Sequence, residues 1–170
     1  MKGITVTSAV MTISGNVTEA IAGTMVEEQV PLSLDILGRE VLLVYAIDIN
    51  PENPEAIAGT NTFVDATLST TSRTSVGTIA DTNVLAQAQK AIRAGGYVDG
   101  GVAFQDQSPE TPTAAHLDYI GIVSTNDFFV QVKGFQNIGV KGCNWRMWCA
   151  RAKVTADIYA ALVQSETLSA

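Results

Sequence analysis

Apolar and polar residues alternate with a period of two over most of the chain, which is the spacing of strands rather than helices. Residues 4–11 alternate in this way, and residues 24–37 form a second extended segment that contains Pro31. Proline lacks the N–H that a central strand donates, so Pro31 places this strand at a sheet edge or break. Turns are predicted at Gly15-Asn16 and at residues 37–39.

Residues 41–49 break the alternation, because both the odd- and the even-numbered positions are apolar until Asp48. Such a strand is expected to be covered on both faces and to belong to the core. The doubled Asn-Pro-Glu that follows predicts a rigid loop, in which Glu52 and Glu55 are interpreted as solvated turn residues. Residues 60–78 are rich in Thr and Ser and predict a half-exposed strand.

Residues 81–96 carry the one pattern typical of a helix inside the chain. Asp81 is a suitable N-cap, apolar residues recur at helical spacing, Lys90 and Arg93 occupy the last turn, and Gly95-Gly96 ends the pattern. We therefore expect a short helix in a connection between strands.

The second half of the chain predicts further strands. Residues 97–116 form a passage rich in loops with a short strand at 101–105, and residues 117–134 predict a hairpin with its turn at 125–127. Residues 144–156 follow as another strand, and residues 157–166 are either a short helix or a last strand.

These segments together number seven to nine strands without alternation of strand and helix. They predict an all-β fold, a single antiparallel two-sheet sandwich of the jelly-roll type with one short helix in a connection. A length of 170 residues and a mass of 17.9 kDa suit one domain spanning residues 1–170.

Charge is sparse and unevenly spread along the chain. Charged residues make up 16% of the sequence and the net charge is −7, yet residues 128–154 contain five of the ten cations, both tryptophans and no acid. Copies of the chain could associate head to tail through such complementary segments, or the fold could bring cations and acids together within one copy.

Recognisable catalytic or metal-binding chemistry is missing from the sequence. His116 is the sole histidine, and no nucleophile elbow, phosphate loop or dinucleotide fingerprint occurs. Cys143 and Cys149, six apart on one strand, are ~20 Å from each other, too far for a disulfide. We interpret them as buried small residues, with an intersubunit disulfide as the alternative. We therefore expect no enzyme activity, cofactor, metal site or small-molecule substrate.

Segments that would direct the chain to a membrane are not predicted. The longest apolar run, residues 41–47, is far shorter than the ~20 residues that span a bilayer. Thr and Ser interrupt the first ten residues, so no signal peptide is expected and the chain is expected to stay where it is made.

Three interpretations compete for residues 128–154. Nucleic-acid binding is opposed by a pI near 4.5. A carbohydrate platform on Trp145, Trp148 or Tyr119 is opposed because the two tryptophans have opposite parity and point to different sheet faces. The third, which we favour, places one face in the core and the other against a neighbouring copy. Its candidate interface residues are Lys133, Lys141, Arg146, Trp148, Arg151 and Lys153.

The strand "VLLVYAIDIN" before a Pro-rich loop, the segment "YIGIVSTNDFFVQVKG" and the closing "RMWCARAKVTADIYAALVQSE" resemble the jelly-roll coat proteins of icosahedral viruses. The chain is most similar to the single jelly-roll major capsid subunits of membrane-containing or double-stranded-DNA viruses of archaea and bacteria. This resemblance implies a self-assembling structural virion protein, made in the host cytoplasm and located in the capsid.

The resemblance also implies partners. They are copies of the same chain, with a second coat protein and an inner membrane as open alternatives. The N-terminus "MKGITVTSAV" has one Lys and departs from the basic arm of small RNA-virus coat proteins, so no tight binding of the genome is expected. A lectin-like carbohydrate-binding module and a phage decoration protein remain the alternative functions.

Overall fold

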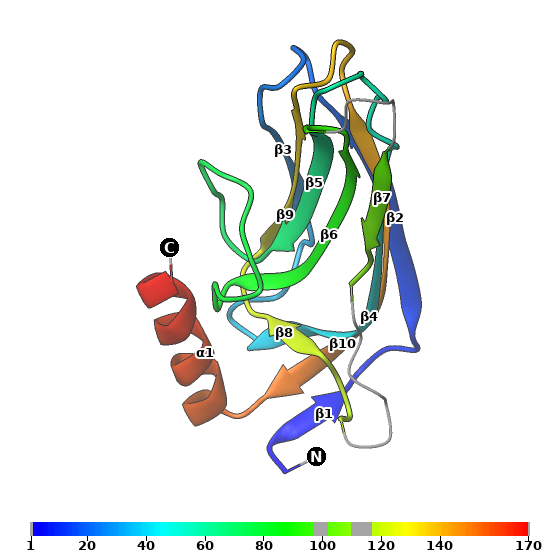
Figure 1. The fold of residues 1–170 in the computed structure, drawn as a ribbon. Coiled ribbons are helices and arrows are strands. Elements are labelled where there is room, and N and C mark those ends of the chain that lie inside the picture. Colours follow the sequence, from blue (N-terminus) through cyan, green and yellow to red (C-terminus); the bar gives the residue numbers. More distant parts are fainter. Residues whose placement is uncertain (1, 97–101, 110–116, 170) are drawn as a thin grey trace.

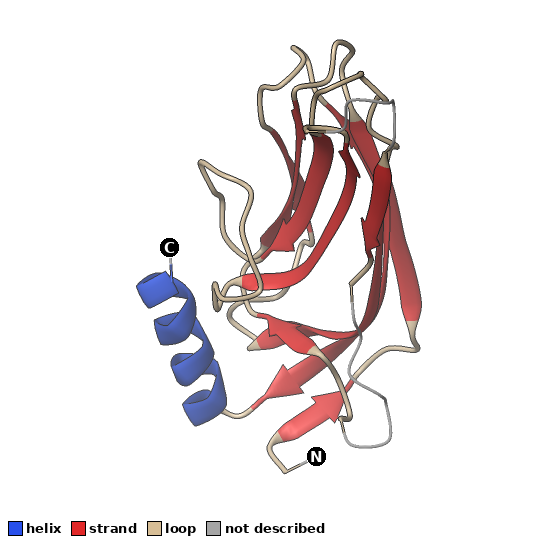
Figure 2. Cartoon of the chain, viewed as in Figure 1, coloured by secondary structure: helices blue, strands red, loops and turns tan. Residues whose placement is uncertain are grey.

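A computed structural model describes residues 2–96, 102–109 and 117–169 of the chain (Figure 1). These residues form ten strands and one C-terminal helix (Figure 2). The elements are β1 (Ile4–Val6), β2 (Met11–Thr18), β3 (Val26–Pro31), β4 (Glu40–Pro51), β5 (Thr62–Ser69), β6 (Val84–Arg93), β7 (Ala103–Gln107), β8 (Gly121–Val123), β9 (Asp127–Phe135), β10 (Gly142–Val154) and α1 (Ala156–Ser169).

The strands form two antiparallel sheets that face each other. In the first sheet β1 and β2 both pair with β10, which is followed by β4 and β8. In the second sheet the order is β3-β9-β5-β6-β7. Figure 1 shows the two sheets packed as a sandwich, with α1 at one corner.

The order of the strands is that of a jelly roll. If β1 and β7 are set aside, the first of the remaining eight strands pairs with the last, the second with the seventh, the third with the sixth, and the fourth with the fifth. This is the pattern of one long antiparallel ribbon rolled into two sheets, which gives two Greek keys. The predicted fold class is therefore confirmed.

The core lies between the sheets and follows the alternation seen in the sequence. On β9, Phe128, Val130 and Val132 are fully buried and point inward. On β10, Cys143, Trp145, Met147 and Cys149 have the same parity and join the same cluster.

β4 is covered on both faces, as its apolar residues predict. Leu42 and Val44 belong to the core between the sheets. Val41 and Leu43 point to the outer face of the first sheet, where Ile158 of α1 packs on the same cluster. The helix therefore seals the outer side of a strand that would otherwise expose apolar residues to water.

The helix predicted over residues 81–96 is wrong, because residues 84–93 form β6. β6 lies between β5 and β7 and pairs with both, and its Ala86 and Ala88 pack into the core. Pairing on two sides satisfies the backbone hydrogen-bonding groups along the strand. This outweighs the local preference of the sequence for a helix. The helix that the described residues form is α1, one of the two structures expected for the C-terminal segment.

The hairpin predicted over residues 117–134 is also wrong. β8 pairs with β4 in the first sheet, whereas β9 pairs with β3 and β5 in the second. The turn at 125–127 thus carries the chain from one sheet to the other. Gly15-Asn16 is likewise no turn but the middle of β2, where Gly15 accommodates the ring of Trp145, whose Cζ2 atom is 2.7 Å from where a Cβ atom would lie.

Candidate functional site

Two loops meet at the end of the sandwich where β2 ends and β10 begins (Figure 1). They comprise residues 19–25 and 136–141, and the Glu19 N–H donates to the Lys141 carbonyl at 2.9 Å. The side chain of Glu19 is 3% exposed and accepts hydrogen bonds from the N–H groups of Gly134 at 2.8 Å and Lys141 at 2.9 Å. This buried carboxylate fixes both ends of loop 136–141.

Glu55, from the loop after β4, holds the tip of the same loop. Its carboxylate accepts the N–H groups of Ile138 at 2.7 Å and Gly139 at 3.0 Å, and pairs with the Lys141 ammonium at 3.3 Å. The two backbone N–H groups, followed by Lys141, lower the pKa of Glu55 from its ordinary value of 4.5. In return Asn137 accepts the Glu55 N–H at 2.9 Å.

The result is a fixed loop that presents apolar side chains to solvent. Ile138 is 81% exposed and Ile21 of the adjoining loop is 67% exposed. Phe135, at the end of β9, stacks on Phe63 with ring centroids 4.5 Å apart, and Val140 is also exposed. We name the four residues Ile21, Phe135, Ile138 and Val140 the loop-end patch. Exposed apolar residues held in a defined geometry favour contact with another protein.

The two tryptophans of β10 point to opposite sides of the first sheet, as their parity predicts. Trp145 is 4% exposed and meets the ring of Phe128 edge-on at 5.4 Å in the core. Trp148 is half-buried on the outer face, where the Arg146 guanidinium lies 5.9 Å from its ring centroid. The two tryptophans therefore do not form one aromatic platform for a sugar.

Two of the predicted interface cations are used inside the chain. Lys141 is buried and pairs with Glu55. Arg151 pairs with Glu40 at 2.8 Å and donates to the carbonyl of Leu32 at 2.9 Å. The fold therefore brings cations of the basic segment to acids of the acidic segment within one copy, the second of the two arrangements that the charge distribution allows.

The other four candidates lie on separate surfaces. Arg146 and Trp148 share the outer face of the first sheet. Lys133 is exposed on the outer face of the second sheet, and Lys153 is exposed near β1, where it is in register with Thr5. The six residues do not form one cluster, and their role in an interface stays a prediction.

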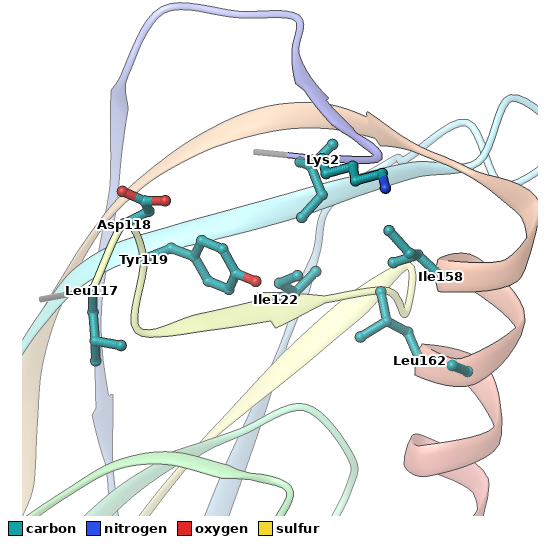
Figure 3. Close-up of a pocket in the computed structure, with 9 residues that line it drawn as sticks. Lys2, Leu117, Asp118, Tyr119, Ile122, Ile158 and Leu162 are labelled. Atoms are coloured by element: carbon teal, nitrogen blue, oxygen red, sulfur yellow. The ribbon is translucent and has the colours of Figure 1, made fainter.

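A pocket of about 690 Å³ opens between α1, β1 and the segment before β8. Its walls are mainly apolar, and Figure 3 shows Ile122, Ile158 and Leu162 facing it together with the ring of Tyr119. Lys2 extends over the same space (Figure 3). No local pattern predicts a pocket here, because its walls combine the N-terminal residues with segments more than a hundred residues later in the chain.

The described residues contain no group of three His, Cys, Asp or Glu side chains placed to hold a metal ion. His116 lies outside the described residues. Cys143 and Cys149 are free and buried, which confirms their interpretation as small buried residues. Burial, with smaller contributions from Glu28 and Glu52, raises the pKa of the Cys143 thiol to about 12. In the part of the chain that is described, α1 is too short and too polar to cross a bilayer.

Sequence reasoning missed the two carboxylates that organise the loop end. Glu55 was interpreted as a solvated turn residue, and Glu19 carried no signal at all. Their partners lie between 82 and 122 residues away along the chain, so no local pattern could identify them.

Comparisons with known proteins add little to this geometry. No protein-family model and no curated protein matches the sequence. A solved structure from Desmodium yellow mottle tymovirus is similar at 13% identity, with 86% of this chain and 87% of that chain covered and a TM-score of 0.30. The fold is identified by the strand pairing described above and not by this similarity.

Proposed function

We propose that the chain is a self-assembling coat subunit of a virus particle, with a structural and not a catalytic role. The observation that carries this proposal is the loop-end patch, a set of exposed apolar side chains at one end of a jelly roll. Two of them, Ile138 and Val140, lie on a loop that Glu19 and Glu55 hold in place. Jelly rolls recur in viral capsids and in lectins. A rigid apolar end suits the first use, because subunits of a shell bury such surfaces against one another.

A carbohydrate-binding role is less well supported. The outer face of the first sheet carries one tryptophan, and Arg146 already lies against it. The proposed partners are therefore copies of the same chain, with a second coat protein, an inner membrane or a host particle as further possibilities that assembly experiments address.

Ile138→Lys tests the proposal, and Ile79→Lys is its matched control. Both isoleucines are loop residues, with exposures of 81% and 78%, but Ile79 belongs to the loop between β5 and β6. The measurements are molar mass by light scattering on a sizing column and negative-stain electron microscopy. We expect particles or closed rings from the unmodified chain and from Ile79→Lys, and their loss in Ile138→Lys with an unchanged melting temperature.

Two outcomes contradict the proposal. An unmodified chain that stays monomeric at every concentration and salt would contradict the coat function, and binding on a glycan array would then favour the lectin alternative. Assembly that survives Ile138→Lys would remove the loop-end patch from the interface.

A further inference from the structure

β2 is an edge strand. In the part of the chain that the structure describes, it pairs with a neighbour on one side only, and its other side is open. It is hydrogen-bonded to β10 along its whole length, from Met11 to Thr18, and no other described strand pairs with it. Figure 1 shows it at the margin of the sandwich. An unpaired strand edge is a template for another strand.

The pattern of hydrogen bonds identifies which backbone groups are free. The Glu19 N–H donates to the Lys141 carbonyl, in register with the β2–β10 ladder. In an antiparallel ladder, residues alternate between pointing their N–H and C=O groups toward one neighbour and toward the other. The odd-numbered residues of β2 therefore face β10. The even-numbered residues direct both backbone groups to the open side, and they are Thr12, Ser14, Asn16 and Thr18.

β2 also lacks the features that protect natural strand edges from pairing. The edge strand of the second sheet, β3, carries Glu27 and Glu28 and ends at Pro31, and the opposite edge strand, β7, contains Asp106. β1 and β8 have three residues each. β2 has eight residues without a charge or a proline. Charges, prolines and short length are the usual means of blocking edges.

We propose that β2 pairs with β2 of a second copy, antiparallel and about a twofold axis at Gly15. The inference rests on the proposed function in that it names a contact through which the subunit assembles. In this register Thr12 lies opposite Thr18 and Ser14 opposite Asn16, so every free backbone group of the strand finds a partner. Residues that face the core in one copy continue on the same face in the other, and the two first sheets become one.

The residues that flank β2 indicate a second copy as the partner rather than an unrelated strand. Val10, just before the strand, is 61% exposed, and Ile21, just after it, is among the most exposed apolar residues. Antiparallel pairing about a twofold axis brings the start of one strand to the end of the other. Val10 of each copy then lies near Ile21 of its neighbour, and both are covered.

The test compares two lysine substitutions on neighbouring strands. Asn16 of β2 and Asn144 of β10 are opposite each other in register, and both are exposed on the outer face. Asn16→Lys places a charge at the open edge, whereas Asn144→Lys places the same charge on a strand paired on both sides. We expect Asn16→Lys to weaken the dimer at least tenfold, measured as molar mass against concentration, and Asn144→Lys to leave it unchanged.

Ser14→Pro is a second variant that keeps the result decisive if a lysine disturbs folding. It removes an N–H that points to the open side and leaves the ladder to β10 intact, so circular dichroism and the melting temperature should stay close to those of the unmodified chain. Its dimer should be weakened like that of Asn16→Lys.

The outcomes separate this inference from the coat function. Particles that form equally well from Asn16→Lys and Ser14→Pro would overturn the edge pairing and leave the coat function in place. A dimer that both variants abolish, in a chain that never forms larger assemblies, would support the edge pairing and contradict the coat function. A monomeric unmodified chain overturns the edge pairing.

Discussion

Trp145 and Trp148 lie three residues apart on β10 and do different things. Trp145 packs edge-on against Phe128 between the sheets, over the space that Gly15 leaves open. Trp148 lies on the other side of the same sheet beside Arg146. The sequence interpretation allowed both the core and an interface for this strand, and the side chains divide between the two faces.

Alanine substitutions should separate the two roles. We expect Trp145→Ala to lower the free energy of unfolding by about 3–5 kcal/mol, because it leaves a cavity in the core. Trp148→Ala should cost less than Trp145→Ala, because Trp148 is only half-buried and its removal leaves no closed cavity in the core. Urea denaturation monitored by circular dichroism measures both, and equal losses would contradict the assignment of faces.

Glu55 makes the loop-end patch sensitive to acid. Its pKa in the folded chain is lowered, so the ionised form is stabilised by folding. That contribution is present in full above the ordinary pKa of 4.5 and is lost as the pH falls through the lower folded value. We expect the protection of the Ile138 and Gly139 N–H groups against exchange, relative to the intrinsic exchange rate at each pH, to fall as the pH is lowered below 4.5.

Glu55→Gln is the control for that measurement. Glutamine keeps an acceptor oxygen but does not titrate, so the protection of Ile138 and Gly139, relative to the intrinsic rate, should no longer change with pH in this range. A dependence that persists in the variant would assign the effect to another acid.

For Arg151 and Lys141, residue type alone does not show whether the cation pairs within the chain or lies at an interface. Arg151 is an interface candidate because Arg beside aromatic residues is typical of contact surfaces, and Lys141 because its charge can meet acids of a neighbouring copy. Their acids, Glu40 and Glu55, lie 111 residues away from Arg151 and 86 residues before Lys141 in the sequence, and the sandwich brings each pair together. A pairing at that distance depends on the topology.

β6 is the element in which local preference and final structure disagree. Its alanines satisfy a helix as well as they satisfy a sheet, because Ala has high helix propensity yet is small enough to pack between sheets. In the fold they pair with β5, where Ala88 lies opposite Ala66 and both are fully or nearly fully buried. The neighbouring strands decide the outcome.

A peptide of residues 81–96 should show the preference that the protein overrides. We expect it to be partly helical in water near 0 °C by circular dichroism, because a segment of this length is a marginal helix without its neighbours. A scrambled peptide of the same composition, with its N-cap and its helical spacing disrupted, serves as the control. A strand-like or fully disordered spectrum, unchanged on scrambling, would contradict a local origin of the pattern.

At the scale of the whole molecule, the two sheets share one hydrophobic cluster. Residues from both sheets, among them Leu42, Leu68, Phe128 and Met147, belong to it. Each sheet would expose its inner face to water without the other.

This shared core predicts cooperative unfolding. Differential scanning calorimetry of a variant that does not assemble, such as Ile138→Lys, should give one transition whose calorimetric and van't Hoff enthalpies agree. Two transitions would contradict the prediction that residues 1–170 form a single domain.

The sequence by itself determined that the chain is built from strands, that β4 is covered on both faces, that Trp145 and Trp148 point to opposite faces and that the cysteines are small buried residues. These follow from periodicity, burial and residue chemistry, which act over a few neighbours. Tertiary structure alone decided the pairing of β8 and β9 with different sheets, the strand form of β6, the ion pairs of Lys141 and Arg151, and the loop-end patch. Each of these depends on contacts between segments far apart in the chain, and such contacts form only when the chain folds into the two packed sheets.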